Sequence, residues 1–316
     1  MIINDVEINS DIELLTPQSH ENVAVIPLKG KNNYIDLLTL KKGFELGLVE
    51  VKECDTSTVN TLIVKNNSVT PLILIDGEEV VGGDQNRLVN ATTIIPANSQ
   101  TKISVSCTER GRWAYKSEFK SSAHIADFNT RRRKAFALRS SRPVQHEVWS
   151  SIDELQAERN FISPTSAMSE SYDNARVDLE GMLSSFEIVD GQTGILIIIN
   201  GEIKGFELFL NSEIYRAFHE KILKSYLINA KVENTTFTIN TDEARLVIEN
   251  AFDSGFEEKP SLGLEESYEF ENADGLGKAY IYEDEIVHFS YFKKLNEESS
   301  SDDVIADGDI ESGVRD

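Results

Sequence analysis

Short apolar runs rich in β-branched residues, each closed by turn residues, constrain the fold of this chain more than any other feature of its sequence. They include NVAVIPL at 22–28, LILI at 72–75 and GILIII at 194–199. Such runs are typical of strands, and the dipeptides Asp76-Gly77 and Asn200-Gly201 are strong signals for two-residue hairpins. The pattern predicts an antiparallel, β-rich body.

Between these β-prone regions, apolar residues recur every three or four positions, which is the spacing of one face of an amphipathic helix. The predicted fold class is therefore α+β, with helices between the β-rich parts of the body. Helices are predicted over residues 35–46, 123–138, 144–159, 166–183, 211–228 and 242–252.

Two segments resemble each other: LILIDGEEVVGG at 72–83 and ILIIINGEIKGF at 195–206. Each has an apolar run, an Asp/Asn-Gly turn and a glutamate directly after the turn, Glu78 in the first and Glu202 in the second. Any buried hairpin has this pattern, so it fits two unrelated hairpins as well as a duplicated β unit. We predict a single α+β domain over 22–295, with candidate halves 22–120 and 190–295 joined by a helical segment, an N-terminal extension over 1–21, and an acidic, disordered tail over 296–316.

The composition excludes several classes of partner. The formal net charge is −23, which opposes binding to nucleic acid and to anionic membranes. No apolar run approaches the roughly 20 residues that span a bilayer, and the N-terminus lacks the pattern of a signal peptide. The cysteines, Cys54 and Cys107, fit a reducing cytoplasm, and the histidines show no metal-ligand spacing. We expect a cytoplasmic protein with no metal and no other cofactor.

One part of this acidic chain is basic. Between Arg110 and Arg142, ten Lys and Arg residues are opposed only by Glu118 and Asp127. This basic segment either binds an anion or pairs with the acidic surface of the chain itself. Its densest part, Arg131 to Lys134, has the pattern of a solvated helix face.

Polar residues gather where the strand after Asp76-Gly77 begins and ends. Successive strand residues face opposite sides, so at most one of Glu78 and Glu79 is expected to face the core or a pocket; otherwise they form a solvated hairpin end. The triplet Gln85-Asn86-Arg87 offers amide and guanidinium groups that suit a phosphate or carboxylate. It could equally hold backbone in place at a bend.

A second polar cluster, Glu109 to Trp113, follows the predicted strand 102–107. Arginine side chains can clamp an anion there, Trp113 offers a stacking face, and Gly111 allows a tight turn. The alternative is a structural role, with Glu109 pairing to arginine and Trp113 sealing the core. The strand phase places Cys107 in the core, although nearby arginines leave a reactive thiolate open.

At these residues the chain resembles the ADP-ribosylglycohydrolase- and rhodanese-phosphatase-associated protein domain family. That family's pattern is G-E-x-[LV]-x-G-x-x-Q-N-R, followed by V-S-C-x-E-x-G-R-W. The resemblance extends over about 22–292, including INGEIKGFELF and GLGKAYIYEDEIVHFSYF. Every fixed letter is present, as Gly77-Glu78, Gly82, Gln85-Asn86-Arg87, Val105-Ser106-Cys107, Glu109 and Gly111-Arg112-Trp113.

Because the family is named for gene neighbours that handle ADP-ribose and phosphate esters, the resemblance implies an ADP-ribose-like ligand but no particular reaction. The first hypothesis is a nucleotide-handling protein, catalytic or purely binding, in ADP-ribose- or NAD-linked metabolism. The second is a non-enzymatic interaction module that docks a partner enzyme. Under the first, the catalytic candidates are Glu78 and Glu109, and the ligand-binding candidates are Gln85, Asn86, Arg87, Arg110, Arg112 and Trp113.

Overall fold

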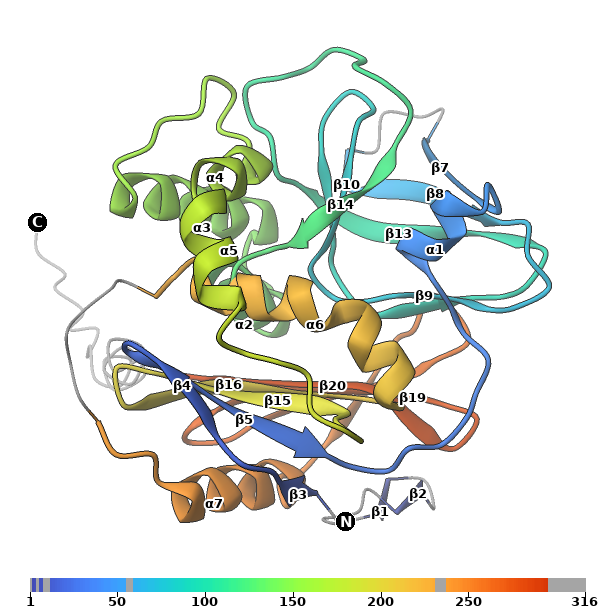
Figure 1. Cartoon of the computed structure of the whole chain (residues 1–316). Helices are drawn as coiled ribbons and strands as arrows, with labels where there is room; N and C mark the ends of the chain where they lie inside the picture. The colour runs from blue at the N-terminus through green and yellow to red at the C-terminus, as the bar shows by residue number, and fades with distance from the viewer. Residues whose placement is uncertain (1, 4–5, 8–11, 55–58, 231–236, 295–316) are drawn as a thin grey trace, which may run out of the picture.

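The computed structural model describes residues 2–3, 6–7, 12–54, 59–230 and 237–294. Its β-sheets form an upper and a lower layer with helices between them and on their flanks (Figure 1). Nearly all strand pairs are antiparallel, which confirms the predicted α+β, β-rich class. The predicted tail over 296–316 lies outside the described residues.

The lower layer is a nine-stranded antiparallel sheet in the order β17-β18-β19-β20-β16-β15-β5-β3, with β4 also paired to β5. Its central strands are apolar on both faces: Ile195 and Ile197 pack toward the helices between the layers, while Leu196 and Ile198 pack in the core on the other face. The strands are β3 (Glu13–Leu14), β4 (Gln18–His20), β5 (Val23–Lys29), β15 (Gly194–Ile199), β16 (Glu202–Phe209), β17 (Glu257–Lys259), β18 (Glu266–Glu271), β19 (Gly275–Tyr282) and β20 (Glu285–Lys293).

The upper layer contains a six-stranded sheet, β14-β10-β11-β13-β8-β7, and a three-stranded sheet, β12-β9-β6. A compact apolar core that includes Leu62, Leu74 and Val105 lies between these two sheets. A short pair, β1 (Ile2–Ile3) and β2 (Val6–Glu7), stands apart. The upper strands are β6 (Leu38–Thr39), β7 (Val49–Glu53), β8 (Thr61–Asn66), β9 (Leu72–Leu74), β10 (Glu78–Val81), β11 (Arg87–Val89), β12 (Thr93–Ile95), β13 (Ser99–Cys107) and β14 (Lys120–Ile125).

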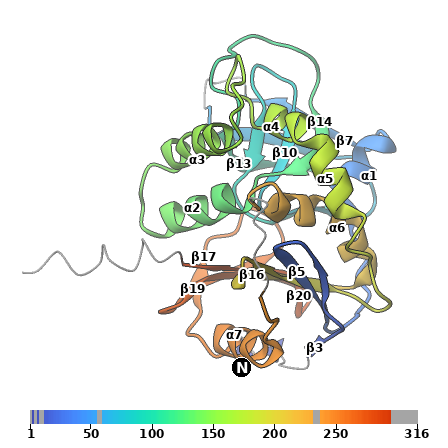
Figure 2. The same ribbon diagram turned by 60° about the vertical axis from the view of Figure 1, so that its left-hand side comes forward.

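Helices α2 and α6 lie between the two layers, and α7 covers the opposite face of the lower sheet (Figures 1 and 2). The expected helix over 35–46 is shorter, because residues 38–39 join a strand. Asn211 is the N-cap of α6, since its side chain accepts a hydrogen bond from Ile214 N. No helix in the described ranges is long and apolar enough to cross a membrane. The helices are α1 (Leu40–Glu45), α2 (Phe128–Arg139), α3 (Val144–Glu158), α4 (Met168–Asn174), α5 (Arg176–Leu183), α6 (Ser212–Leu227) and α7 (Thr241–Phe252).

The two dipeptide turns have different roles. Asn200 and Gly201, with φ of 54° and 80°, join the paired strands β15 and β16, as predicted. Asp76-Gly77 also forms a tight turn, since Glu78 N donates to Ile75 O over 3.1 Å. Its flanking strands are not paired, however: β9 pairs with β12 and β6, whereas β10 pairs with β11 and β14. The predicted hairpin is therefore wrong, because this turn carries the chain from one sheet to another.

Candidate functional site

The two halves of the sequence motif meet in the six-stranded sheet. Strand β11 pairs with β13 so that Arg87 lies directly opposite Cys107. The bend 82–86 before β11 and the loop after β13 therefore come together at the same edge. Thr108 N donates to Asn86 O over 3.1 Å, which closes this edge.

Arg112 is the centre of the cluster formed there. Its guanidinium makes six hydrogen bonds, two of them to Glu109 Oε2, at 2.9 and 2.6 Å. The others reach the carbonyls of Gly82, Gly83 and Ala114 and the Asn86 side chain. We call Gly82, Gly83, Asn86, Glu109, Arg112 and Thr165 the motif brace, because their mutual bonds join three loops.

Glu109 is almost fully buried in the motif brace, with a side chain 5% exposed. Burial alone raises the pKa of a carboxyl, but hydrogen bonds from Arg112 and Thr165 and the charge of Arg112 lower the pKa of Glu109 below its usual value. Thr165 Oγ1 donates to Glu109 Oε1 over 3.0 Å, so both carboxylate oxygens have partners. Glu109 is an ionised structural acceptor in this arrangement.

The triplet before β11 also bonds within the chain. Gln85 Nε2 donates to the Glu109 carbonyl over 2.7 Å, and Arg87 bonds to Gln85 Oε1 and pairs with Glu53. The Arg87 side chain is 3% exposed. All three residues of the triplet hold backbone or each other, as in the second alternative derived from the sequence.

Glu78 and Glu79 are both fully buried, which overturns the expectation that at most one faces the interior. They do point in opposite directions, but both faces of β10 are covered. Glu78 pairs with Lys221 of α6 over 3.0 Å. Glu79 accepts from Thr108 Oγ1 over 2.7 Å, and burial raises the pKa of Glu79 to about 7. By contrast, Glu202 is exposed, so the two similar segments differ in environment.

Cys107 and two members of the second polar cluster, Trp113 and Arg110, differ in how far they are buried. Cys107 is fully buried, as its strand phase predicts, and burial raises the pKa of its thiol. Trp113 is 62% exposed and therefore does not seal the core. Arg110 has a side chain 46% exposed and forms a two-bond pair with Asp153, at 2.9 and 3.2 Å.

A second group of charges lies between the two layers, and the sequence reading missed it. Arg131 of α2 pairs with Glu207 of β16 through two bonds of 2.7 Å, and both side chains are inaccessible. Lys134, one turn further along α2, bonds to Asp76. Both α2 residues therefore point inward, so the prediction of a solvated helix face is wrong. We call Asp76, Arg131, Lys134, Glu207, Lys278 and His288 the interlayer cluster.

The charge states in the interlayer cluster follow from burial and pairing. Burial opposes ionisation of Glu207, yet Arg131 and a hydrogen bond from His288 lower its pKa to about 2. Burial lowers the pKa of Lys134 to about 8 despite the neighbouring Asp76. Gly77 makes room for this packing: with φ at 93°, a Cβ there would lie 2.9 Å from Arg131 Cδ.

A sequence signal for this cluster did exist. Phe128, Arg131 and Ala135 are spaced by three and four residues, so one stripe of α2 carries both apolar side chains and a charge. The acidic partners of Arg131 and Lys134 are 76 and 58 residues away along the chain, and no local pattern identifies these partners. Most of the basic segment pairs with the chain's own carboxylates, including Arg133 with Glu154 and Arg139 with Glu257.

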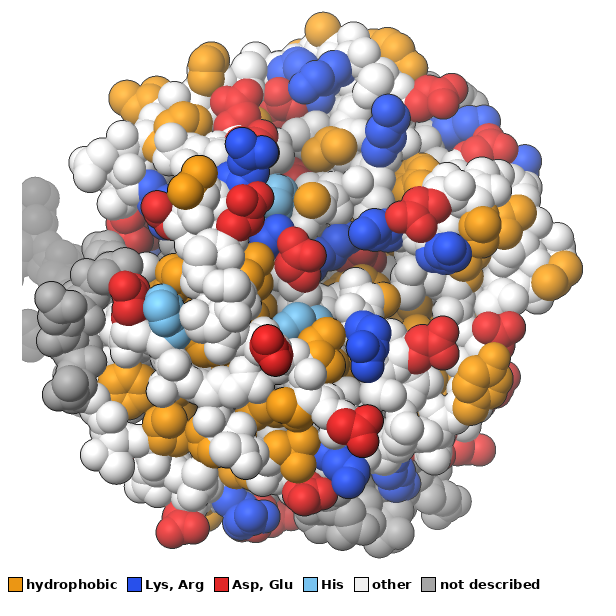
Figure 3. Space-filling view, in the orientation of Figure 1, with side chains coloured by type: hydrophobic (Ala, Val, Ile, Leu, Met, Phe, Trp, Pro, Cys, Tyr) orange, Lys and Arg blue, Asp and Glu red, His pale blue; other side chains and the backbone are white. Residues whose placement is uncertain are grey.

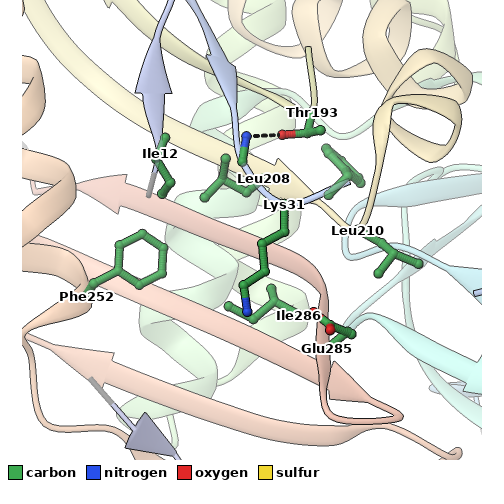
Figure 4. A pocket seen from close by; sticks show the side chains of 10 residues that line it. Ile12, Lys31, Thr193, Leu208, Leu210, Phe252, Glu285 and Ile286 are labelled. Carbon is green, nitrogen blue, oxygen red and sulfur yellow. Dashed lines mark hydrogen bonds between the residues drawn. The ribbon is translucent and has the colours of Figure 1, made fainter. Parts of the chain in front are cut away.

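The cavities of the described structure lie away from the motif's charges. One cavity, of about 510 Å³, opens between α3 and the loop 160–166. Another of about 310 Å³ lies where the ends of α3 and α6 approach α5. A small one of about 60 Å³ lies over the lower sheet, with an apolar wall formed by residues such as Leu208, Phe252 and Ile286 (Figure 4). Glu78, Arg87, Glu109 and Arg112 line none of these three.

The structure thus brings Gln85, Asn86, Arg87, Glu109 and Arg112 together, but the charged residues of the predicted site already have partners within the chain. Glu78 is paired with Lys221, Arg87 with Glu53, and Glu109 with Arg112. Among the residues that the structure describes, no group of three His, Cys, Asp or Glu side chains could hold a metal ion.

Comparison with known proteins gives one match. The family model of the ARG and Rhodanese-Phosphatase-superfamily-associated Protein domain matches residues 11–292. No curated protein and no solved structure matches the chain.

Proposed function

This chain belongs to the family of the ARG and Rhodanese-Phosphatase-superfamily-associated Protein domain, and we propose that it is a non-enzymatic module that binds a partner protein. The family description names association with other proteins. One observation carries the proposal: the charged residues of the family motif are already paired within the chain, while the loops held by Glu109 and Arg112 expose large apolar side chains.

These loops, residues 110–118 and 160–166, are called the docking loops. They stand side by side, because Gly111 N donates to Thr165 O over 2.8 Å and Thr165 also bonds to Glu109. Trp113, Tyr115 and Ile162 on them are 62%, 68% and 88% exposed. Hydrophobic side chains are visible along the upper rim of the molecule in Figure 3, where Figure 1 shows these loops.

Exposed Trp and Tyr side chains on a braced loop match the energetics of protein interfaces. A few such residues carry most of the binding free energy in a typical interface, and Trp and Tyr are enriched among them. The motif brace keeps the backbone of the docking loops ordered before binding, so less conformational entropy is lost on association. The motif then serves the interface indirectly, by positioning it.

Binding of an ADP-ribose-like anion, the function first predicted from the motif, ranks second. It is favoured by the half-exposed side chain of Arg110, which lies at a variable position of the motif, whereas Arg87 and Arg112 are largely buried. Arg87 and Arg112 would have to leave Glu53 and Glu109 to act as the predicted phosphate clamp. Separating either pair is unfavourable, because a largely buried arginine or glutamate would lose its counter-charge.

The test uses the full chain and two purified enzymes, one from the ADP-ribosylglycohydrolase family and one from the rhodanese-phosphatase superfamily. We expect one of them to bind, and the double variant Trp113→Ala/Tyr115→Ala to weaken binding about tenfold or more. Leu246→Ala is the matched control, because Leu246 is 55% exposed on α7, on the far side of the lower sheet. Its affinity should equal that of the unmodified chain.

The unmodified chain and its variants are titrated with ADP-ribose, and their thermal unfolding is measured. A ligand at 100 times its dissociation constant stabilises a protein by about 2.7 kcal/mol. Saturable stabilisation by ADP-ribose, with neither enzyme bound, would overturn the proposal in favour of the second candidate.

A further inference from the structure

The cavity of about 510 Å³ beside α3 adjoins the docking loops. Its walls are the last turns of α3, with Asp153 and Ala157, and the loop residues Phe161 and Ile162. Pockets of roughly 300–1,000 Å³ are typical of sites that enclose a bound group. Since Thr165 of the same loop is bonded to Gly111 and Glu109, the cavity and the docking loops form one continuous surface.

We propose that this cavity receives a large apolar side chain of the partner protein, and that Arg110 at its rim pairs with a carboxylate next to that side chain. This proposal rests on the proposed function. The partner segment that the cavity recognises is an extended stretch with an apolar residue beside an acidic one.

Two polar side chains of the cavity wall, Gln156 and Ser163, already bond within the chain. Gln156 Nε2 donates to Ala167 O and Ser171 Oγ, and its Oε1 accepts from Ser163 N. Ser163 Oγ accepts from Ala167 N over 2.8 Å. These bonds leave Ala157, Phe161 and Ile162 to contact a guest, together with the side chains of Asp153, Asn160 and Ser166. The apolar groups among them suit an apolar side chain.

The local field disfavours a phosphate-bearing guest. The cavity lies at the C-terminal end of α3, which carries the negative end of the helix dipole, and Asp153 adds a carboxylate to its wall. A diphosphate would meet both. A neutral side chain avoids this repulsion, which separates a peptide segment from a nucleotide as the occupant.

Unlike Arg87 and Arg112 of the motif, Arg110 can exchange its carboxylate partner for another. Its pair with Asp153 joins side chains that are 46% and 44% exposed, and such surface pairs contribute only about 0–1 kcal/mol. A partner carboxylate can therefore share Arg110 at little cost. Arg110 also lies over the Trp149 ring, 6.0 Å from its centroid, which holds the guanidinium at the rim.

The loop shape that forms the cavity is fixed before binding. Asn160 and Ser166 both have φ of 51°, a conformation that residues other than glycine adopt only where their surroundings hold them. Asn160 N bonds to Ala157 O, and Ser166 N bonds to Ser163 O. The loop thus presents an open, preformed wall.

The test fills the cavity from its exposed edge. Ala157→Phe adds a ring at an exposed helix position that lines the cavity, and Leu246→Phe on α7 is the matched control. A random peptide display library is selected against the unmodified full chain. We expect selected peptides that place Phe, Leu, Ile or Trp beside Asp or Glu. Ala157→Phe should weaken them about tenfold or more, Arg110→Gln severalfold, and Leu246→Phe not at all.

Three results would overturn the cavity inference: no selected peptide, peptides that bind Ala157→Phe as well as the unmodified chain, or ADP-ribose binding that Ala157→Phe abolishes. The enzymes used for the proposed function separate the two claims. If Trp113→Ala/Tyr115→Ala abolishes enzyme binding and Ala157→Phe does not, the docking loops bind the enzyme and the cavity inference is wrong. If the peptides bind as expected but neither enzyme does, the cavity inference holds and the two enzymes are not the partners.

Discussion

The interlayer cluster and the docking loops both contain arginine–carboxylate pairs, yet the environment gives these pairs opposite roles. Arg131 and Glu207 are inaccessible, and each is the main counter-charge of the other. Arg110 and Asp153 have the same two-bond geometry with nearly half of each side chain in water. Identical chemistry therefore fixes the interior in one place and remains available to a partner in the other, and burial decides which.

The strongest challenge to this comparison is Arg131→Met. It leaves Glu207 buried without its main counter-charge, and we expect a loss of about 3–5 kcal/mol in the free energy of unfolding, measured with urea at pH 7. The double variant Arg131→Met/Glu207→Leu should recover most of that loss, because it removes both charges. A single variant as stable as the unmodified chain would show that water reaches this pair.

Arg112→Lys tests the intermediate case, a pair with a 14% exposed arginine. Lysine keeps the charge but cannot reproduce the planar guanidinium that bonds Glu109, Asn86 and three carbonyls. We expect the free energy of unfolding to fall by about 1.5–3 kcal/mol, measured by urea titration. Glu109→Gln should lower the free energy of unfolding by an amount in the same range. Unchanged stability together with weaker binding of ADP-ribose would make the motif a ligand site.

Glu79→Gln tests a buried carboxyl without a paired cation. Because burial raises the folded pKa of Glu79 to about 7, above its unfolded value, its protonated form stabilises the fold at low pH. That contribution is lost as pH rises from about 4.5 through 7, and is about 3 kcal/mol, since a shift of one pKa unit corresponds to about 1.4 kcal/mol. The glutamine variant should lose this dependence and be more stable than the unmodified chain at pH 8. Urea unfolding across pH 5–8 measures the difference.

Arg110→Gln should have the smallest effect on stability, below about 1 kcal/mol, since exposed pairs contribute little. Its unfolding should be compared with that of Asp153→Asn, which removes the other half of the pair. A loss comparable to that of Arg112→Lys would place Arg110 in the structural framework and remove it from the binding surface.

Local patterns predicted much of this fold, and the exceptions share a cause. Helical spacing predicted α3 to within one residue of its observed end, because that spacing depends on neighbours in sequence. The Asp76-Gly77 turn was located, but its strands were paired wrongly, since sheet membership depends on distant partners. Arg131 and Lys134 were placed in solvent for the same reason: the carboxylates of Glu207 and Asp76 that make their burial tolerable lie far away in sequence.

The candidate site shows the same division. The motif predicted that Gln85, Arg87, Glu109 and Arg112 act together, and the structure brings them to one sheet edge. Whether they face a ligand or each other depends on how the bend 82–86 meets the loop after Thr108. That geometry is set by packing against the loop 160–166, which no residue spacing encodes.

Helix α2 holds one charge toward each layer: Arg131 toward Glu207 in the lower sheet and Lys134 toward Asp76 beneath the upper one. In a state with one layer folded and the other unfolded, Arg131 or Lys134 would lose its carboxylate partner while it still lies against the apolar core of the folded layer. Such half-formed species are penalised by several kcal/mol, so unfolding should follow a single cooperative transition. Backbone amides in β16 and β11 should then exchange with solvent deuterium at the same slow rate, as members of one folding unit.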